Sequence, residues 1–132
     1  MRVVVVSDTH GPRRWKACPP AVAEYLRGAG LILHAGDACT ASVLDELAQY
    51  APVRAVVGNN DAPDVAAWGA TPVASLAIEG VAVSMIHDSG AAAGRLERRR
   101  SVGSAAAGQM NRIPVIIEST RLCDVTRPWA LP

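Results

Sequence analysis

The chain has 132 residues, of which 50% are hydrophobic and 19% are charged, and its formal net charge is +1. This composition excludes a disordered chain and predicts one globular domain with a single core. The three cysteines lack CxxC spacing, which argues against a disulfide framework or a thiolate zinc site and favours a reducing, cytoplasmic location.

The first apolar run, Val3 to Val6, is too short for a signal peptide or a membrane span, so we expect neither export nor insertion by that route. Because all four residues are β-branched, the run predicts a strand buried on both faces. It ends at a polar segment, Ser7-Asp8-Thr9-His10-Gly11.

Two units follow the first strand, and each consists of a helix and then a strand. An amphipathic helix is predicted after Pro19 and Pro20, and its expected inner face is Val22, Tyr25, Leu26 and Ala29. A strand over Leu31 to Ala35 then ends at Gly36-Asp37. The next helix, capped by Thr40 or Ser42, has the expected inner face Val43, Leu47, Tyr50 and Ala51.

A third strand, Val53 to Val57, ends at Gly58-Asn59-Asn60-Asp61. The alternation of strands and helices to this point predicts a parallel sheet with right-handed crossovers. After a loop rich in proline and alanine, Val73 to Ile78 and Val81 to Ile86 are predicted to form a hairpin that turns at Glu79-Gly80.

The second arm of this hairpin ends at His87-Asp88. Beyond it we expect a helix over Ala91 to Arg100 and a strand over Ile113 to Ile117. Residues 1 to 90 hold six basic and nine acidic groups (−3), whereas residues 91 to 132 hold seven and three (+4), which together give the net +1. The basic excess centres on Arg95, Arg98, Arg99 and Arg100, which we interpret as a solvated helix face, with phosphate contact as the alternative.

Four separate strands end in side chains that can bind a metal ion. They are Asp8 and His10 after the first strand, Asp37 after the second, Asn59 after the third and His87 after the hairpin. Residues just beyond the carboxyl ends of parallel strands converge on one crevice. Carboxylate, amide and imidazole ligands suit borderline-to-hard divalent cations, so the sequence predicts a metal site there.

Four other polar residues near these positions receive supporting interpretations. We interpret His34 as structural or as a support for a ligand, and Cys39 as a buried inert thiol. Asp61 is interpreted as a carboxylate that orients a ligand or a water molecule, and Asp88 as either such a group or the cap of a turn.

The strand-end motifs together resemble the calcineurin-like metallophosphoesterases, most closely their short bacterial and archaeal phosphodiesterase branch. Val6 to Gly11 nearly matches Ile-Ser-Asp-Thr-His-Gly, His34 to Asp37 matches His-x-Gly-Asp, and Gly58 to Asp61 matches Gly-Asn-x-Asp. The resemblance extends over about residues 1 to 95.

This resemblance implies an α/β fold of the αββα sandwich type, with residues 1–100 as its core and residues 101–132 as a divergent C-terminal segment of the same domain. It also implies a centre of two divalent cations, manganese first, with iron, zinc, nickel or magnesium as alternatives. The ligands would be Asp8 and His10 for one ion and Asn59 and His87 for the other, with Asp37 as the bridge.

The activity implied is hydrolysis of a small phosphodiester or phosphomonoester by a hydroxide that both cations activate. Asn59, Asn60 and Asp61 would be the catalytic residues. We expect no membrane partner and no specific nucleic-acid partner, and self-association into a homo-oligomer remains an open alternative.

The chain departs from the family pattern in two places. Asn60 stands where many members carry a histidine that donates a proton, and an amide cannot do so, which implies water as the donor or esters with good leaving groups. No histidine follows His87, so the late Gly-His-x-His motif is missing and five of seven ligands remain. Gln109, Met110 and Asn111 offer only weak replacements near the expected place.

Two alternatives therefore stay open. A truncated or frame-shifted C-terminus would leave the last strands of the sandwich missing or altered. The other alternative is a catalytically impaired, metal-depleted member of the fold that acts by binding alone, which the small number of histidines keeps open.

Overall fold

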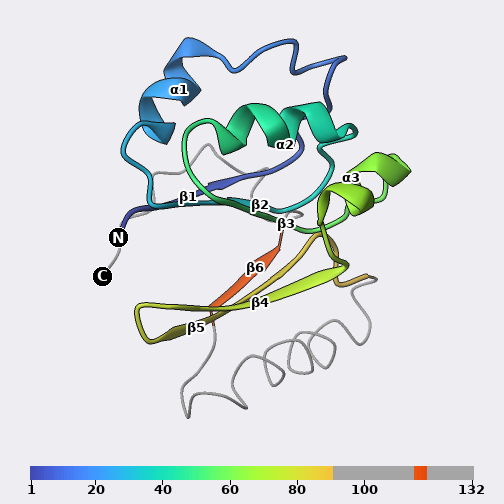
Figure 1. Ribbon diagram of the computed structural model, residues 1–132. Helices are drawn as coiled ribbons and strands as arrows, with labels where there is room; N and C mark the ends of the chain where they lie inside the picture. Colours follow the sequence, from blue (N-terminus) through green and yellow to red (C-terminus); the bar gives the residue numbers. More distant parts are fainter. Residues whose placement is uncertain (91–114, 119–132) are drawn as a thin grey trace.

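The structure is a computed structural model that describes residues 1–90 and 115–118. These residues form a layer of helices, a first sheet and a second sheet, stacked in that order (Figure 1). Three of the expectations lie outside the described residues. They are the helix over residues 91–100 with its arginine cluster, the replacement ligands near residues 109–111, and the divergent segment apart from residues 115–118. A second helical layer, expected for an αββα sandwich, would fall on those residues and stays a prediction, while the mixed α/β class and the two stacked sheets are confirmed.

The first sheet is parallel, as the alternation of strands and helices predicts. Its order is β1 (Val3–Val6), β2 (Leu31–His34) and β3 (Val53–Ala55). Val3 pairs with Leu31 at one end, and the helices α1 (Pro20–Leu26) and α2 (Ala41–Ala48) make the crossovers. All three strands therefore present their carboxyl ends to the same edge.

The helices pack on the outer face of this sheet through small apolar stripes. Val43, Leu44 and Leu47 of α2 are at most 2% exposed and join Leu26 and Ile32 in one core cluster. Tyr25, expected to face inward, is 72% exposed. The reason is geometric: a helix of seven residues buries Ala23 and Leu26 and partly buries Val22, and at 100° per residue Tyr25 falls outside that stripe.

A short third helix, α3 (Pro63–Trp68), stands where a loop was predicted, so that prediction was wrong. Pro63 suits the first turn because it lacks an N–H, and Gly69, at φ 123°, ends the helix. The indole of Trp68 donates to Asp45 Oδ1 of α2 at 2.8 Å. No helix among residues 1–90 is long and apolar enough to cross a membrane.

Asp64 of α3 also completes the start of α2. Thr40 occupies the N-cap position, yet its hydroxyl bonds to Ser42 Oγ at 2.9 Å rather than to the helix backbone. The N–H of Ala41 instead donates to Asp64 Oδ2 at 2.9 Å. The two helices therefore hold each other at the edge where the functional loops lie.

The second sheet has the order β4 (Val73–Ile78), β5 (Val81–Ile86) and β6 (Val115–Glu118). β4 and β5 form the predicted antiparallel hairpin, and Glu79 and Gly80 both adopt positive φ at its turn, while β6 runs parallel to β5. The strand predicted near residues 113–117 is thus present in the described part as Val115–Glu118.

A second core cluster, built on Leu33, Ala35, Val56, Val83 and Met85, lies between the two sheets. β1 contributes to both clusters, since Val4 packs on the helical side and Val3 on the other. Val5 is 37% exposed, however, because β1 is an edge strand of the described sheet. The expectation of full burial on both faces therefore fails at this residue.

Candidate metal centre

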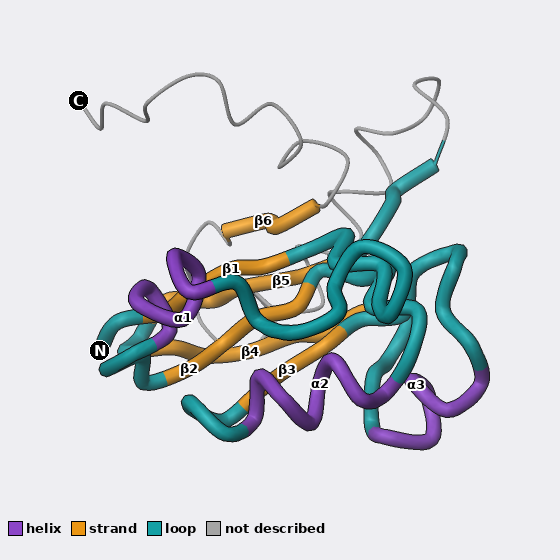
Figure 2. Tube along the Cα trace, turned by 90° about the horizontal axis from the view of Figure 1, so that it is seen from above, coloured by secondary structure: helices purple, strands orange, loops and turns teal. Residues whose placement is uncertain are grey.

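The predicted ligands meet at the carboxyl edge of the parallel sheet. Figure 2 shows the loops that follow the parallel strands gathered at one end of the molecule. One ligand atom from each of Asp8, Asp37 and His87 lies within 4.8 Å of the others. His10 Nε2 is 3.7 Å from Asp37 Oδ2, and Asn59 Oδ1 is 3.0 Å from His87 Nε2. All five predicted metal ligands are therefore neighbours.

Backbone hydrogen bonds continue the pairing of β1 and β2 beyond the strand ends. Asp8 N donates to Gly36 O and His10 N donates to Asp37 O, both at 3.0 Å. Asp8, His10 and Asp37 have φ values of 55°, 49° and 59°, in the left-handed region that side chains rarely adopt. Backbone strain of this kind gathers at functional sites, and here it turns three side chains toward one point.

The ligands form two groups that share Asp37. On one side, His10 Nε2 lies 3.9 Å from Asp8 Oδ1 and 3.7 Å from Asp37 Oδ2. On the other side, His87 Nε2 lies 3.5 Å from the same oxygen of Asp37 and next to Asn59. The only buried carboxylate of the described residues, Asp37 at 3% exposure, thus stands between two imidazoles.

His87 is oriented by the backbone just after β2. Its Nδ1 lies 2.8 Å from the carbonyl oxygen of Ala35, and because a carbonyl only accepts, Nδ1 carries the proton. Nε2 faces Asp37 and Asn59, which is the arrangement found at metal-bound histidines whose other nitrogen donates to a carbonyl. A Cβ at Gly36 would lie 2.5 Å from Nδ1, so only glycine permits this approach.

Asn60 holds the Asp37 carboxylate. Its backbone N–H donates to Oδ1 at 2.9 Å and its side-chain amide donates to Oδ2 at 2.6 Å. Burial raises the pKa of Asp37, but these two bonds, together with His87 and His10, outweigh burial and lower the pKa below its usual value. The geometry therefore makes Asn60 a residue that keeps Asp37 ionised and oriented.

Asp61 holds the backbone of both ligand loops. Its Oδ2 accepts the N–H of Gly58 at 2.6 Å and that of Asp37 at 3.2 Å, while Oδ1 accepts the N–H of Cys39 at 2.6 Å. The loop after β3 is thereby fastened to the loop after β2. Asp61 is an orienting carboxylate, as interpreted from the sequence, and its action is on the backbone.

His34 belongs to the interior beneath the site. It is fully buried, its Nδ1 accepts the N–H of Gly36 at 3.2 Å, and its Nε2 bonds to Thr9 Oγ1 at 3.1 Å. Burial lowers the pKa of His34 to about 4, against smaller opposing effects of the nearby carboxylates. The ring is thus neutral and structural, and two of the three histidines remain for a metal ion.

Cys39 and Asp88 differ in how they relate to the site. Cys39, expected to be a buried inert thiol, is only half-buried, and its Sγ lies 3.3 Å from His10 Nδ1. Burial and the charges of Asp61 and Asp37 raise its pKa, so the thiol stays neutral. Its position two residues after Asp37 is the only sequence signal for this contact. Asp88 is exposed and caps a turn, accepting the N–H of Gly90 at 2.8 Å.

The donor set fits a divalent cation. The site holds two carboxylates, one of them that of Asp37, together with two imidazoles and one amide oxygen. Hard-to-borderline cations prefer such ligands. The backbone of Gly58 packs so closely against the Asp37 carboxylate that only glycine fits, since a Cβ at Gly58 would lie 2.1 Å from Asp37 Oδ1. The described residues could hold the first ion through Asp8, His10 and Asp37, and a second through Asp37, Asn59 and His87.

Comparisons with known proteins agree with the fold and with these motifs. A probable metallophosphoesterase of Methanothermobacter thermautotrophicus is 48% identical over 61 residues, which are 46% of this chain and 36% of that protein. The probable metallophosphoesterase MJ0623 of Methanocaldococcus jannaschii is 41% identical over 61 residues, 46% of this chain and 32% of that protein. The matched part of the chain therefore spans about a third of the length of these curated relatives.

Solved structures with the same fold include two proteins of different origin. The crystal structure of a Vps29 single mutant from Entamoeba histolytica has a TM-score of 0.62 at 22% identity, covering 89% of this chain and 63% of that one. The solution structure of protein TM1076 from Thermotoga maritima has a TM-score of 0.63 at 27% identity, covering 89% and 71%. The sequence model of the calcineurin-like phosphoesterase superfamily domain matches residues 1–111. The chain belongs to the calcineurin-like phosphoesterase superfamily.

Proposed function

We propose that this protein hydrolyses phosphoester bonds, in a phosphodiester or a phosphomonoester, with two divalent cations, manganese first, held around Asp37. The observation that carries the proposal is the position of the Asp37 carboxylate, 3.7 Å from His10 Nε2 and 3.5 Å from His87 Nε2. Each imidazole has a further oxygen ligand beside it, Asp8 for His10 and Asn59 for His87. Family membership supports the same activity.

When bound, divalent cations would supply Lewis-acid activation of water and neutralise the charge that develops on the phosphate. The residues of the chain would prepare the site for that chemistry. Asn60 keeps Asp37 ionised through two hydrogen bonds, and Asp61 fixes the backbone of Asp37 and Gly58. Ala35 O holds the proton of His87 on Nδ1, which leaves Nε2 for a cation.

Protonation of the leaving oxygen would not come from Asn60. Its amide is engaged by Asp37 Oδ2 at 2.6 Å, and an amide group does not release a proton at neutral pH. Water would be the proton donor instead, which favours esters whose leaving groups need little protonation.

A second candidate function is binding without turnover. Two observations favour it: only two of the three histidines face the ligand cluster, and several neighbours in fold are named for another role, such as Vacuolar Protein Sorting 29 from Cryptosporidium parvum, with a TM-score of 0.61 at 21% identity. In that case the cluster would bind metal weakly and the surface would serve a protein partner.

The two functions differ in one assay. The purified chain, loaded with Mn²⁺, is incubated with bis-p-nitrophenyl phosphate and with p-nitrophenyl phosphate. The proposal expects hydrolysis that depends on Mn²⁺, is abolished in Asp37→Asn, and persists in the control Asp45→Asn, where the new amide oxygen can still accept from Trp68. No turnover of either ester by a folded chain would favour the binding function.

A further inference from the structure

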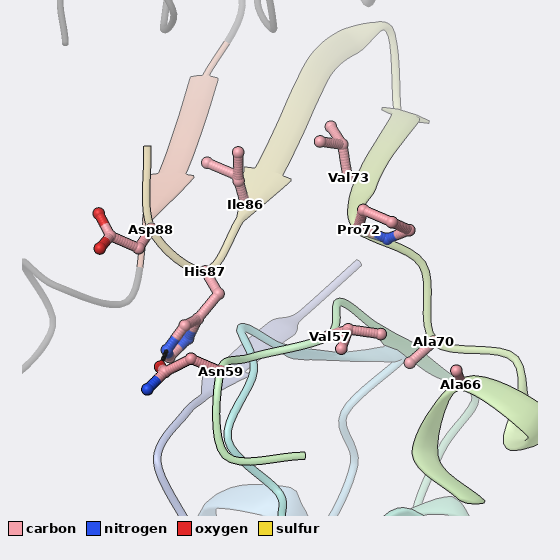
Figure 3. A pocket seen from close by; sticks show the side chains of 9 residues that line it. All are labelled: Val57, Asn59, Ala66, Ala70, Pro72, Val73, Ile86, His87 and Asp88. Carbon is pink, nitrogen blue, oxygen red and sulfur yellow. Dashed lines mark hydrogen bonds between the residues drawn. The ribbon is translucent and has the colours of Figure 1, made fainter. Parts of the chain in front are cut away.

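An apolar pocket opens directly beside Asn59 and His87. Its volume is about 520 Å³, within the range of about 300 to 1,000 Å³ usual for small-molecule sites. Figure 3 shows the two polar side chains on one side of the hollow and apolar side chains around the rest. The apolar lining consists of Val57, Ala66, Ala70, Pro72, Val73 and Ile86.

The walls of this pocket come from elements that the backbone fixes to one another. Val73 and Ile86 lie at the paired ends of β4 and β5, while Ala66 belongs to α3. The segment that connects α3 to β4 lies beside the end of β3, because Thr71 N donates to Ala55 O at 3.2 Å and Val57 N donates to Thr71 O at 2.9 Å. The hollow is therefore formed before any ligand enters.

The charge of the lining decides what can occupy it. Among the described residues that line it, Asp88 is the only charged one, and its carboxylate points away from the apolar walls (Figure 3). That lining has no cationic side chain. An anionic group of the ligand, other than its phosphoryl group, would therefore find no oppositely charged partner in the pocket, whereas an uncharged apolar group would only displace water from apolar walls.

Resting on the proposed function, we infer that this pocket takes the organic group of the phosphoester, and that this group is uncharged and apolar, such as an aryl ring. Asn59 and His87 border both the pocket and the proposed cation site, so a phosphoryl group held at the cations places its ester substituent in the hollow. Ala66 and Ala70 have the smallest side chains of the lining, so they narrow the hollow least. The structure thereby selects among phosphoesters by their apolar group.

Two phosphonates of equal charge test this inference by binding. The affinities of phenylphosphonate and methylphosphonate for the Mn²⁺-loaded chain are measured by calorimetry, which needs no turnover. Burying a ring of this size favours phenylphosphonate by about tenfold or more. In Ala66→Phe, which fills the pocket, that preference falls to about one, whereas Ala67→Phe, one residue along on the exposed surface of α3, keeps it.

Equal affinities for the two phosphonates in the wild type, binding of neither by a chain that has taken up Mn²⁺, or the same loss in both variants would overturn the inference. A chain that takes up no Mn²⁺ contradicts the proposed function instead. Failure of the proposed function looks different: the preference for phenylphosphonate is present, but bis-p-nitrophenyl phosphate is not hydrolysed. Far-ultraviolet circular dichroism of both variants shows that each is folded before its affinities are compared.

Discussion

Asp61 and Asp37 are joined through the backbone, because the Asp61 carboxylate accepts the N–H of Asp37 at 3.2 Å as well as those of Gly58 and Cys39. One side chain thus sets the spacing between the loop that carries Asn59 and the loop that carries Asp37. The two ligand groups of the proposed centre depend on that spacing.

Replacing Asp61 by alanine should therefore weaken metal binding from a distance. Three N–H groups lose their acceptor, which costs about 2 kcal/mol or more of unfolding free energy, and the affinity for Mn²⁺ falls about 10- to 100-fold. Urea unfolding and Mn²⁺ titration measure the two effects. Asp45→Asn, at an exposed position on α2, serves as control, and an unchanged Mn²⁺ affinity in folded Asp61→Ala would refute the orienting role.

Gly58 should be intolerant of even one methyl group. Its added Cβ would lie 2.1 Å from Asp37 Oδ1 and 2.4 Å from Asp37 N, and neither atom can withdraw without breaking the bonds made by Asn60 and Asp61. We expect Gly58→Ala to lose high-affinity Mn²⁺ binding.

The matched control for that change is Gly28→Ala. At Gly28 a Cβ would meet nothing within 4 Å, although its φ of 72° makes alanine costly by about 1 kcal/mol. Gly28→Ala should therefore lower the unfolding free energy slightly and keep Mn²⁺ affinity. Equal Mn²⁺ affinity in the two variants would contradict the close approach of Gly58 and Asp37.

The buried ring of His34 predicts a pH dependence of stability. Its pKa is about 4 in the folded chain and about 6.5 when unfolded, so the unfolded chain binds the proton first as the pH falls. The contribution of His34 is fully present above about pH 6.5 and is lost between about pH 6.5 and 4, a loss of about 3 kcal/mol.

Urea unfolding of the metal-free chain at pH 7 and pH 4.5 measures this loss. His34→Asn, whose side-chain oxygen can replace Nδ1 as the acceptor for Gly36, lacks the titration and should lose less stability over the same interval. Identical pH dependence in wild type and His34→Asn would show that His34 does not carry the effect.

Much of the candidate centre was predictable from the sequence because each ligand follows the end of a strand. Val3–Val6, Leu31–His34 and Val53–Ala55 form one parallel sheet, so Asp8, Asp37 and Asn59 had to meet at one edge. The resemblance to metallophosphoesterases supplied the pairing of ligands, which strand order alone does not give.

The remaining features depend on tertiary contacts that leave weak sequence signals. α3 has only six residues and no clear period, although Pro63 and Gly69 mark its ends, and its indole bond to Asp45 secures it. The contact between Cys39 and His10 depends on a positive φ at both residues, and such φ values are rare for residues other than glycine. The apolar pocket combines residues of α3, β4 and β5 with residues of the adjoining loops, and no single segment indicates it.

The number of Mn²⁺ ions bound per chain decides whether Asp37 lies between two cations. Because Asp37 belongs to both ligand groups, calorimetry or elemental analysis of the wild type should give two equivalents, and Asp37→Asn should lose high-affinity binding while Asp45→Asn retains it. Less than one equivalent bound by a folded wild-type chain, or the same stoichiometry in Asp37→Asn, would contradict a two-cation centre built around Asp37.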